Sequence, residues 1–102
     1  MPTIEQLEEL LGKEPDDIFL NFGIAMALSK DGQVEAALGR FRRTIELDAD
    51  YVAAYFHQGR LLADNGDAGA ARAVLLEGAE AAVRAGEARA RQEIEDLLST
   101  LD

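Results

Sequence analysis

The chain has 102 residues, of which 48% are apolar, so it is long enough to form one domain with a buried core of its own. It contains no cysteine, which excludes disulfide bonds and thiolate metal sites and is compatible with a reducing compartment. Twenty acidic and ten basic residues give a formal net charge of -10, which disfavours nucleic acid and anionic lipid as partners.

Helical periodicity divides the chain into six segments, because apolar residues recur at 3.6-residue spacing between Gly, Pro and Asp. No segment shows the period-two alternation of a β-strand. The first helix is predicted over about residues 3–12. Thr3 and Gln6 form a capping box at its start, and Gly12 is predicted to close it in the left-handed conformation.

The second predicted helix runs near 17–30 and has an uncharged body. Pro15 prevents the first helix from continuing, and either Asp16 or Asp17 can cap the second. Residues 18–29 carry no charge.

The third predicted helix follows the turn at Asp31 and Gly32 and ends near Asp48. Its apolar side consists of Val34, Ala37, Leu38, Phe41, Ile45 and Leu47. Its other side carries Arg40, Arg43 and Glu46. Residues 1–17 hold six acidic residues against one lysine, a net charge of -5, and Arg40, Arg42 and Arg43 form a basic cluster. A solvated helix face explains each of these two clusters more simply than a docking site does.

Three more helices complete the prediction. A fourth runs from a cap at Asp50 to Asp64, and a fifth runs from a cap at Asp67 to about Ala85, each closed by a glycine turn. The sixth, over 87–101, has an apolar stripe made of Ile94, Leu97, Leu98 and Leu101.

The chain overlays on itself at a period of about 34 residues, so that Gly32 falls on Gly66. The other matching pairs are Ala25 and Gly59, Leu28 and Leu62, Ala37 and Ala71, and Phe41 and Leu75. Pro15, Ala49 and Val83 occupy one recurring position. A fixed period of this length predicts a stack of helix pairs, each too small to bury its apolar face alone.

These residues resemble the tetratricopeptide repeat, in which a large residue, Leu-Gly and a second large residue precede Ala-x3-Phe and Pro. The second copy reads Tyr55-x2-Gln58-Gly59-x2-Leu62, Ala71-x3-Leu75 and Val83. The first copy reads Asn21-x2-Ile24-Ala25-x2-Leu28, Ala37-x3-Phe41 and Ala49. The resemblance implies an all-α fold, an α-solenoid of antiparallel helix pairs. It divides the single domain into a half repeat (3–15), two repeats (18–51 and 52–85) and a capping helix (87–101).

A second frame competes with this repeat frame, because Phe19-x2-Phe22-Gly23 imitates the first half of the pattern. The small residue must stand 12 positions before the alanine of the second helix, which Ala25 does and Gly23 does not. A two-residue slip turns a helix by about 200°, so the frame decides which side chains face outward.

The resemblance implies that the first helix of each pair lines a concave ligand-binding groove. The residues at the family's contact positions are Phe19, Phe22, Met26, Ser29 and Lys30 in the first copy and Phe56, His57, Arg60 and Asp64 in the second. Helical spacing supports this set, because the second helix has two apolar stripes and one neighbour can cover only one of them. The alternative is that a terminal helix covers Phe19, Phe22 and Met26, which then belong to the core.

The clamp by which some family members hold acidic chaperone tails is not carried over, because Phe22 and Met26 stand where that clamp has Lys and Asn. His57 and Arg60 could still hold one carboxylate. One histidine, no cysteine and no glycine-rich phosphate loop argue against an enzyme, a metal site and a bound cofactor.

The predicted function is a protein-protein interaction module that binds a peptide or protein segment in its groove as a monomer or weak homodimer. The alternative is a self-assembling structural subunit in which the same surfaces meet across a twofold axis. The start of the chain has no basic leader followed by an apolar run, and no stretch is long enough for a membrane span, so a cytoplasmic protein is expected.

Overall fold

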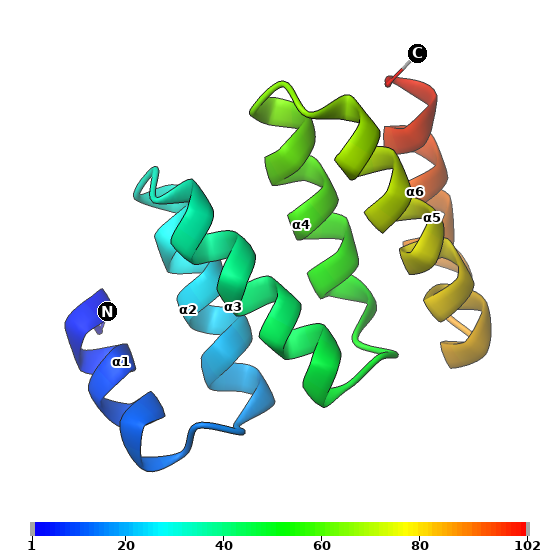
Figure 1. Ribbon diagram of the computed structural model, residues 1–102. Coiled ribbons are helices and arrows are strands. Elements are labelled where there is room, and N and C mark those ends of the chain that lie inside the picture. Colours follow the sequence, from blue (N-terminus) through cyan, green and yellow to red (C-terminus); the bar gives the residue numbers. More distant parts are fainter. Residues whose placement is uncertain (1, 102) are drawn as a thin grey trace. The chain divides into compact units, whose positions relative to one another are not determined.

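The computed structural model describes residues 2–101, and every regular element among them is a helix (Figure 1). The helices are α1 (Ile4–Lys13), α2 (Ile18–Lys30), α3 (Val34–Leu47), α4 (Val52–Asp64), α5 (Ala68–Ala85) and α6 (Ala88–Ser99). The predicted all-α class is therefore confirmed, and the predicted helix bounds differ from these by one or two residues at most ends.

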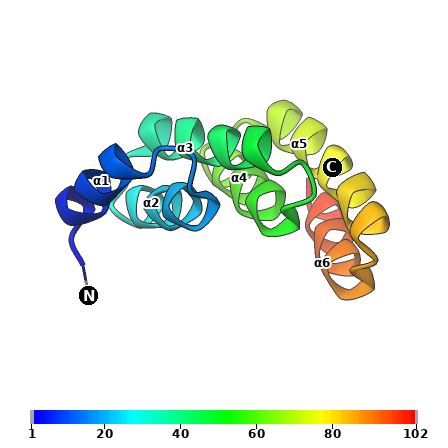
Figure 2. The ribbon, with the colours of Figure 1, turned by 90° about the horizontal axis from the view of Figure 1, so that it is seen from below.

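The contacts of the chain cluster into two compact units, an N-terminal unit that ends at Asp48 and a C-terminal unit that begins at Ala49. Each unit contains one helical hairpin, α2–α3 in the first and α4–α5 in the second. Each also has a single helix beside its hairpin. Helix α1 packs on α2, and α6 packs on both α5 and α4 (Figure 2).

The first two helices begin with side-chain caps, as predicted. The Thr3 hydroxyl accepts a hydrogen bond from the Gln6 N–H at 3.1 Å, and the Thr3 N–H donates to the Gln6 side chain at 2.8 Å. At the start of α2, the Asp17 carboxylate accepts from the Leu20 N–H at 2.9 Å.

The prediction that Gly12 closes α1 is wrong, because α1 continues through Gly12 to Lys13. The helix ends where the backbone approaches Pro15: Glu14 lies at φ -133° and ψ 64°, outside the helical region that a residue before proline avoids. The proline, and not the glycine, determines where α1 ends.

The prediction that Asp50 caps α4 is also wrong. The residue before α4 is Tyr51, which makes no side-chain capping bond. The Asp50 carboxylate instead accepts a hydrogen bond from Arg84 of α5 at 2.8 Å. Asp67 does cap α5, by accepting from the Ala70 N–H at 3.1 Å.

The two hairpin turns have the same geometry at equivalent positions of the repeat. Gly32 and Gly66 adopt the left-handed conformation, with φ of 80° and 84°. The Gln33 N–H donates to the Leu28 carbonyl at 2.9 Å, and the Asp67 N–H donates to the Leu62 carbonyl at 2.9 Å. These bonds satisfy carbonyls that the helix ends leave without a partner.

The structure distinguishes the two sequence frames at the glycines. Ala25 is fully buried, and a Cβ added to Gly59 would lie 2.5 Å from the Leu75 Cγ. A Cβ added to Gly23 would meet nothing within 4 Å. The close approach of helices therefore occurs at Ala25 and Gly59, as the repeat frame requires.

Candidate protein-binding surfaces

The three apolar candidates on α2 differ in exposure. Phe19 is 77% exposed, whereas Phe22 is half-buried and its ring meets Phe41 edge-on, with the ring centroids 6.1 Å apart. Met26 is half-buried as well. The predicted stripe is therefore one exposed phenylalanine followed by two partly covered side chains.

Met26 lies next to α1, the terminal helix that the alternative interpretation invokes, but it is only half-buried and is not part of the buried core. Met26 shares an open hollow with Ile4 and Leu7 of α1, and Ser29 and Lys30 lie at its polar end. Phe19 does not line this hollow.

The candidates on α4 divide in the same way. Phe56 and His57 are half-buried, with their rings at 85° and their centroids 5.3 Å apart. Both line a small cavity that α6 closes with Ala90 and Glu93. Arg60 and Asp64 are exposed.

Burial lowers the pKa of His57 below its usual value of 6.5, and the positive charge of Arg60 lowers it further, against a smaller upward effect from Glu93. This shift favours the neutral form of the imidazole near pH 7. A neutral ring against α6 is a poor anchor for a carboxylate, so Arg60 is the better candidate for that role.

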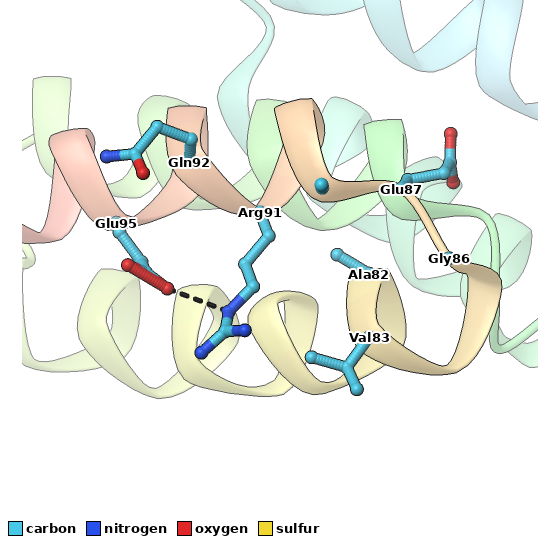
Figure 3. A pocket seen from close by; sticks show the side chains of 8 residues that line it. Ala82, Val83, Gly86, Glu87, Arg91, Gln92 and Glu95 are labelled. Carbon is cyan, nitrogen blue, oxygen red and sulfur yellow. Dashed lines mark hydrogen bonds and ion pairs between the residues drawn. The ribbon is translucent and has the colours of Figure 1, made fainter.

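A further hollow lies where α5 turns into α6, a place that the sequence analysis did not single out (Figure 3). Ala82, Val83 and Gly86 form one wall, and Arg91 and Glu95 of α6 form the other. The Arg91 guanidinium donates to the Glu95 carboxylate at 2.8 Å. The charges on this wall are therefore paired with each other.

Residues 2–101 contain no cluster of three or more His, Cys, Asp or Glu side chains placed to bind a metal ion. None of the helices in this part of the chain has the length and apolar character to span a membrane.

The fold is thus a helical repeat, a class in which stacked helix pairs present binding surfaces. No protein-family model matches the chain. The chain is 31% identical to the TPR repeat-containing protein PA0015 of Pseudomonas aeruginosa over 99 residues, which cover 97% of this chain and 94% of that protein. On this basis the chain belongs to the tetratricopeptide-repeat family.

Solved structures agree with this assignment. The solution structure of protein BPP2914 from Bordetella parapertussis is 28% identical, with a TM-score of 0.85 over 99% of this chain and 88% of that chain. A tetratricopeptide repeat domain protein from Salinibacter ruber is 27% identical, with a TM-score of 0.80 over 86% of this chain and 89% of that chain. The fold and these relatives are those of a protein-protein interaction module.

Proposed function

We propose that the protein binds a segment of another protein through side chains exposed on α2 and α4, the first helices of its two hairpins. We propose that it does so without catalysis. One observation carries the proposal most strongly: Phe19 is 77% exposed on α2, a helix with no charge before Lys30. Exposing a large aromatic ring to water is unfavourable unless a partner covers it.

The role of each candidate follows from its burial. Phe19 serves as the aromatic anchor, since aromatic side chains dominate the energetics of interfaces. Met26 adapts to the partner because its unbranched side chain fills irregular gaps. Phe22 contributes less, because it is half-buried and its ring already contacts Phe41 edge-on.

In the C-terminal unit, exposed Arg60 and Asp64 supply charge. Arg60 is suited to a carboxylate of the partner, because a guanidinium donates two parallel hydrogen bonds to it. Phe56 and His57 lie against α6 and add apolar surface at its edge.

The test is affinity capture from the source organism followed by mass spectrometry, with tagged wild-type protein and matched variants. Phe19→Ser removes the proposed anchor. Val83→Ser is its control, because Val83 is also apolar and 59% exposed but lies on α5. Phe22→Ala is less suitable, since it also removes the contact with Phe41.

Wild type and Val83→Ser are expected to retain one partner that Phe19→Ser loses, and Arg60→Ser is expected to weaken its retention. Equal retention by all four proteins would contradict the proposed surface. If no partner is captured and wild type sediments as a stable dimer that Phe19→Ser dissociates, the self-assembling alternative is correct instead.

A further inference from the structure

The chain has two asparagines, and they differ in their surroundings. Asn21 is fully buried, its Nδ2 group donates to two backbone carbonyls, and its Oδ1 atom accepts from Arg40. Asn65 is exposed and ends α4 in the turn to α5. Asparagine is among the thermolabile side chains of proteins, because its amide can be replaced by a carboxylate. The exposed asparagine is therefore the one that is open to this change.

The side chain at this turn position is held in the first hairpin and not in the second. The residue equivalent to Asn65 is Asp31, whose carboxylate accepts a hydrogen bond from the Gln33 side chain at 2.7 Å. The residue equivalent to Gln33 is Asp67, whose carboxylate cannot donate and instead caps α5 by accepting from the Ala70 N–H. Within residues 2–101 the Asn65 side chain makes no hydrogen bond, so its amide is free to rotate.

The residue that follows Asn65 is Gly66, and its backbone nitrogen is the nearest nucleophile along the chain. Glycine has no Cβ to hinder an attack by this nitrogen, and the space around the Cβ position of Gly66 is open within 4 Å. A ring that joins the Gly66 nitrogen to the Asn65 Cγ atom has five members: this nitrogen and the carbonyl carbon, Cα, Cβ and Cγ of Asn65. The pair therefore has the atoms for cyclisation in the correct order.

The closed turn does not allow this ring to form. Asn65 lies at ψ 9°, whereas ring closure requires its Cβ and the Gly66 nitrogen to be eclipsed about the Cα–C bond. The Gly66 N–H also donates to the Ala63 carbonyl at 3.1 Å, and the Asp67 N–H donates to the Leu62 carbonyl at 2.9 Å. Cyclisation thus requires the turn to open, and surface turns open locally at a lower cost than unfolding of the whole chain.

We propose that Asn65 is a site of spontaneous deamidation, which takes place when the turn between α4 and α5 opens. Base removes the proton from the Gly66 nitrogen, which attacks the Asn65 Cγ atom. The bond between this nitrogen and Cγ forms, the bond between Cγ and Nδ2 breaks, and ammonia leaves a succinimide ring. Water then opens the ring at either carbonyl and gives aspartate or isoaspartate. The net reaction consumes one water molecule and releases one ammonia molecule.

The two products have different consequences for the turn. Aspartate at position 65 reproduces the pair Asp31 and Gly32 of the first hairpin, so the turn accommodates it. Isoaspartate carries the main chain through Cγ and so inserts one more carbon atom, which disrupts the spacing of the hydrogen bonds that close the turn. Either product adds a negative charge beside Asp64 on α4, whether or not a partner binds there.

The test incubates folded, full-length protein in mildly alkaline buffer and then digests it with trypsin, which cleaves after Arg60 and Arg72 and releases residues 61–72. Mass spectrometry of this fragment measures the conversion of Asn65, and a protein-isoaspartate methyltransferase, used as a reagent, measures isoaspartate. The fragment that contains Asn21 is the internal control. An unincubated sample corrects for conversion during the digestion, and a synthetic peptide with residues 61–72 gives the rate without the turn.

Asn65 is expected to convert in the folded protein, more slowly than in the peptide, while Asn21 stays intact. Asp67→Ala removes the α5 cap and is expected to speed both the hydrogen exchange of the Gly66 amide and the conversion about fivefold, relative to a peptide with the same change. Gly66→Ala is expected to slow the conversion about tenfold or more, because its Cβ hinders the attack, even though φ 84° makes alanine unfavourable in the turn. The separated isoaspartate form is expected to melt at a lower temperature than Asn65→Asp.

An Asn65 that stays intact in the folded protein after the peptide has converted completely would overturn the proposal. Conversion of Asn21 at the same rate would do so as well, since it would remove the selectivity of the site. Faster conversion in Gly66→Ala would show that the Gly66 nitrogen does not attack Asn65. A conversion rate that Asp67→Ala leaves unchanged while Gly66 exchange rises would contradict the requirement for an open turn.

Discussion

At the scale of single residues, Asn21 shows how one position tolerates very different side chains. Its Nδ2 group donates to the Pro15 carbonyl at 3.0 Å, and at the equivalent position of the next repeat the Tyr55 hydroxyl donates to the Ala49 carbonyl at 2.8 Å. The two residues therefore make the same hydrogen bond at the start of their repeats. Asn21 also accepts from Arg40 at 2.8 Å, so its buried amide is fully used.

Asn21 is smaller than its equivalent Tyr55, and the second helix of the first hairpin carries a correspondingly larger residue. An added Cβ at Gly78 would lie 2.6 Å from the Tyr55 Cβ, so α4 and α5 approach each other here too closely for any residue but glycine at position 78. The position equivalent to Gly78 in the first repeat is Thr44, a larger residue that is fully buried. A large residue facing a small one in the second repeat thus corresponds to two medium residues in the first, which keeps both cores filled.

The Asn21 bonds lead to a first prediction. Asn21→Ala is expected to lower the free energy of unfolding by about 1–3 kcal/mol, because it leaves the Pro15 carbonyl and the Arg40 guanidinium without their buried partner. Gln33→Ala, which removes a single exposed bond to Asp31, is the control and is expected to change it by less than about 0.5 kcal/mol. Urea denaturation followed by circular dichroism measures both, and equal effects would contradict the role given to Asn21.

The depressed pKa of His57 leads to a second prediction. Below its ordinary pKa of 6.5 the unfolded chain takes up a proton that the folded chain, with its lower pKa, does not. The folded state therefore loses stability as the pH falls from 6.5 through the folded pKa. Between pH 7.5 and 5, wild type is expected to lose more unfolding free energy than His57→Gln.

The chain has one histidine, so its imidazole signals titrate without overlap in a proton NMR spectrum. A midpoint below 6.5 is expected. A midpoint above 6.5, or an equal pH dependence in wild type and His57→Gln, would show that the ring is not desolvated against α6.

At the scale of elements, the sequence predicts helices best where the chemistry is local. The Thr3 capping box, the Asp17 cap and the glycine turns depend on bonds within a few residues, and all of them are present. The capping role predicted for Asp50 is wrong because its partner Arg84 lies in the next helix, which helix-start rules do not consider. The closing role predicted for Gly12 is wrong because glycine permits the left-handed conformation without requiring it.

The left-handed turn residues lead to a third prediction. Gly66→Ala is expected to lower the free energy of unfolding by about 1 kcal/mol, because a Cβ is unfavourable at φ 84°. Gly69→Ala, nearby in α5 and with open space around its Cβ, is expected to be neutral or stabilising. Thermal melts of the two variants provide the comparison, and a Gly66→Ala protein as stable as wild type would contradict the turn geometry.

At the scale of the whole molecule, the sequence identifies the family and the repeat frame but only part of the candidate surface. Phe19 is exposed, as a binding residue has to be. The burial of Phe22 depends on where the Phe41 ring lies, and the cover over His57 depends on how α6 docks. Both are consequences of tertiary packing, which periodicity along one helix does not contain.

Which side chains can meet a partner depends on where the paired helices approach each other closely. They do so at Ala25 and Gly59, and not at Gly23. If α2 were turned by the two-residue slip, Asn21 and Leu28 would face water and the exposed set would be a different one. Both are buried, with exposed fractions of 0% and 5%.

The most direct test compares the free energies of unfolding of Gly23→Ala and Gly59→Ala in urea. Gly59→Ala is expected to lose about 1–3 kcal/mol, because its Cβ would overlap the fully buried Leu75. Gly23→Ala is expected to gain about 0.5–1 kcal/mol, because it replaces a helical glycine where space is free. The opposite order, with Gly23→Ala destabilised and Gly59→Ala unharmed, would contradict the repeat frame and the binding surfaces derived from it.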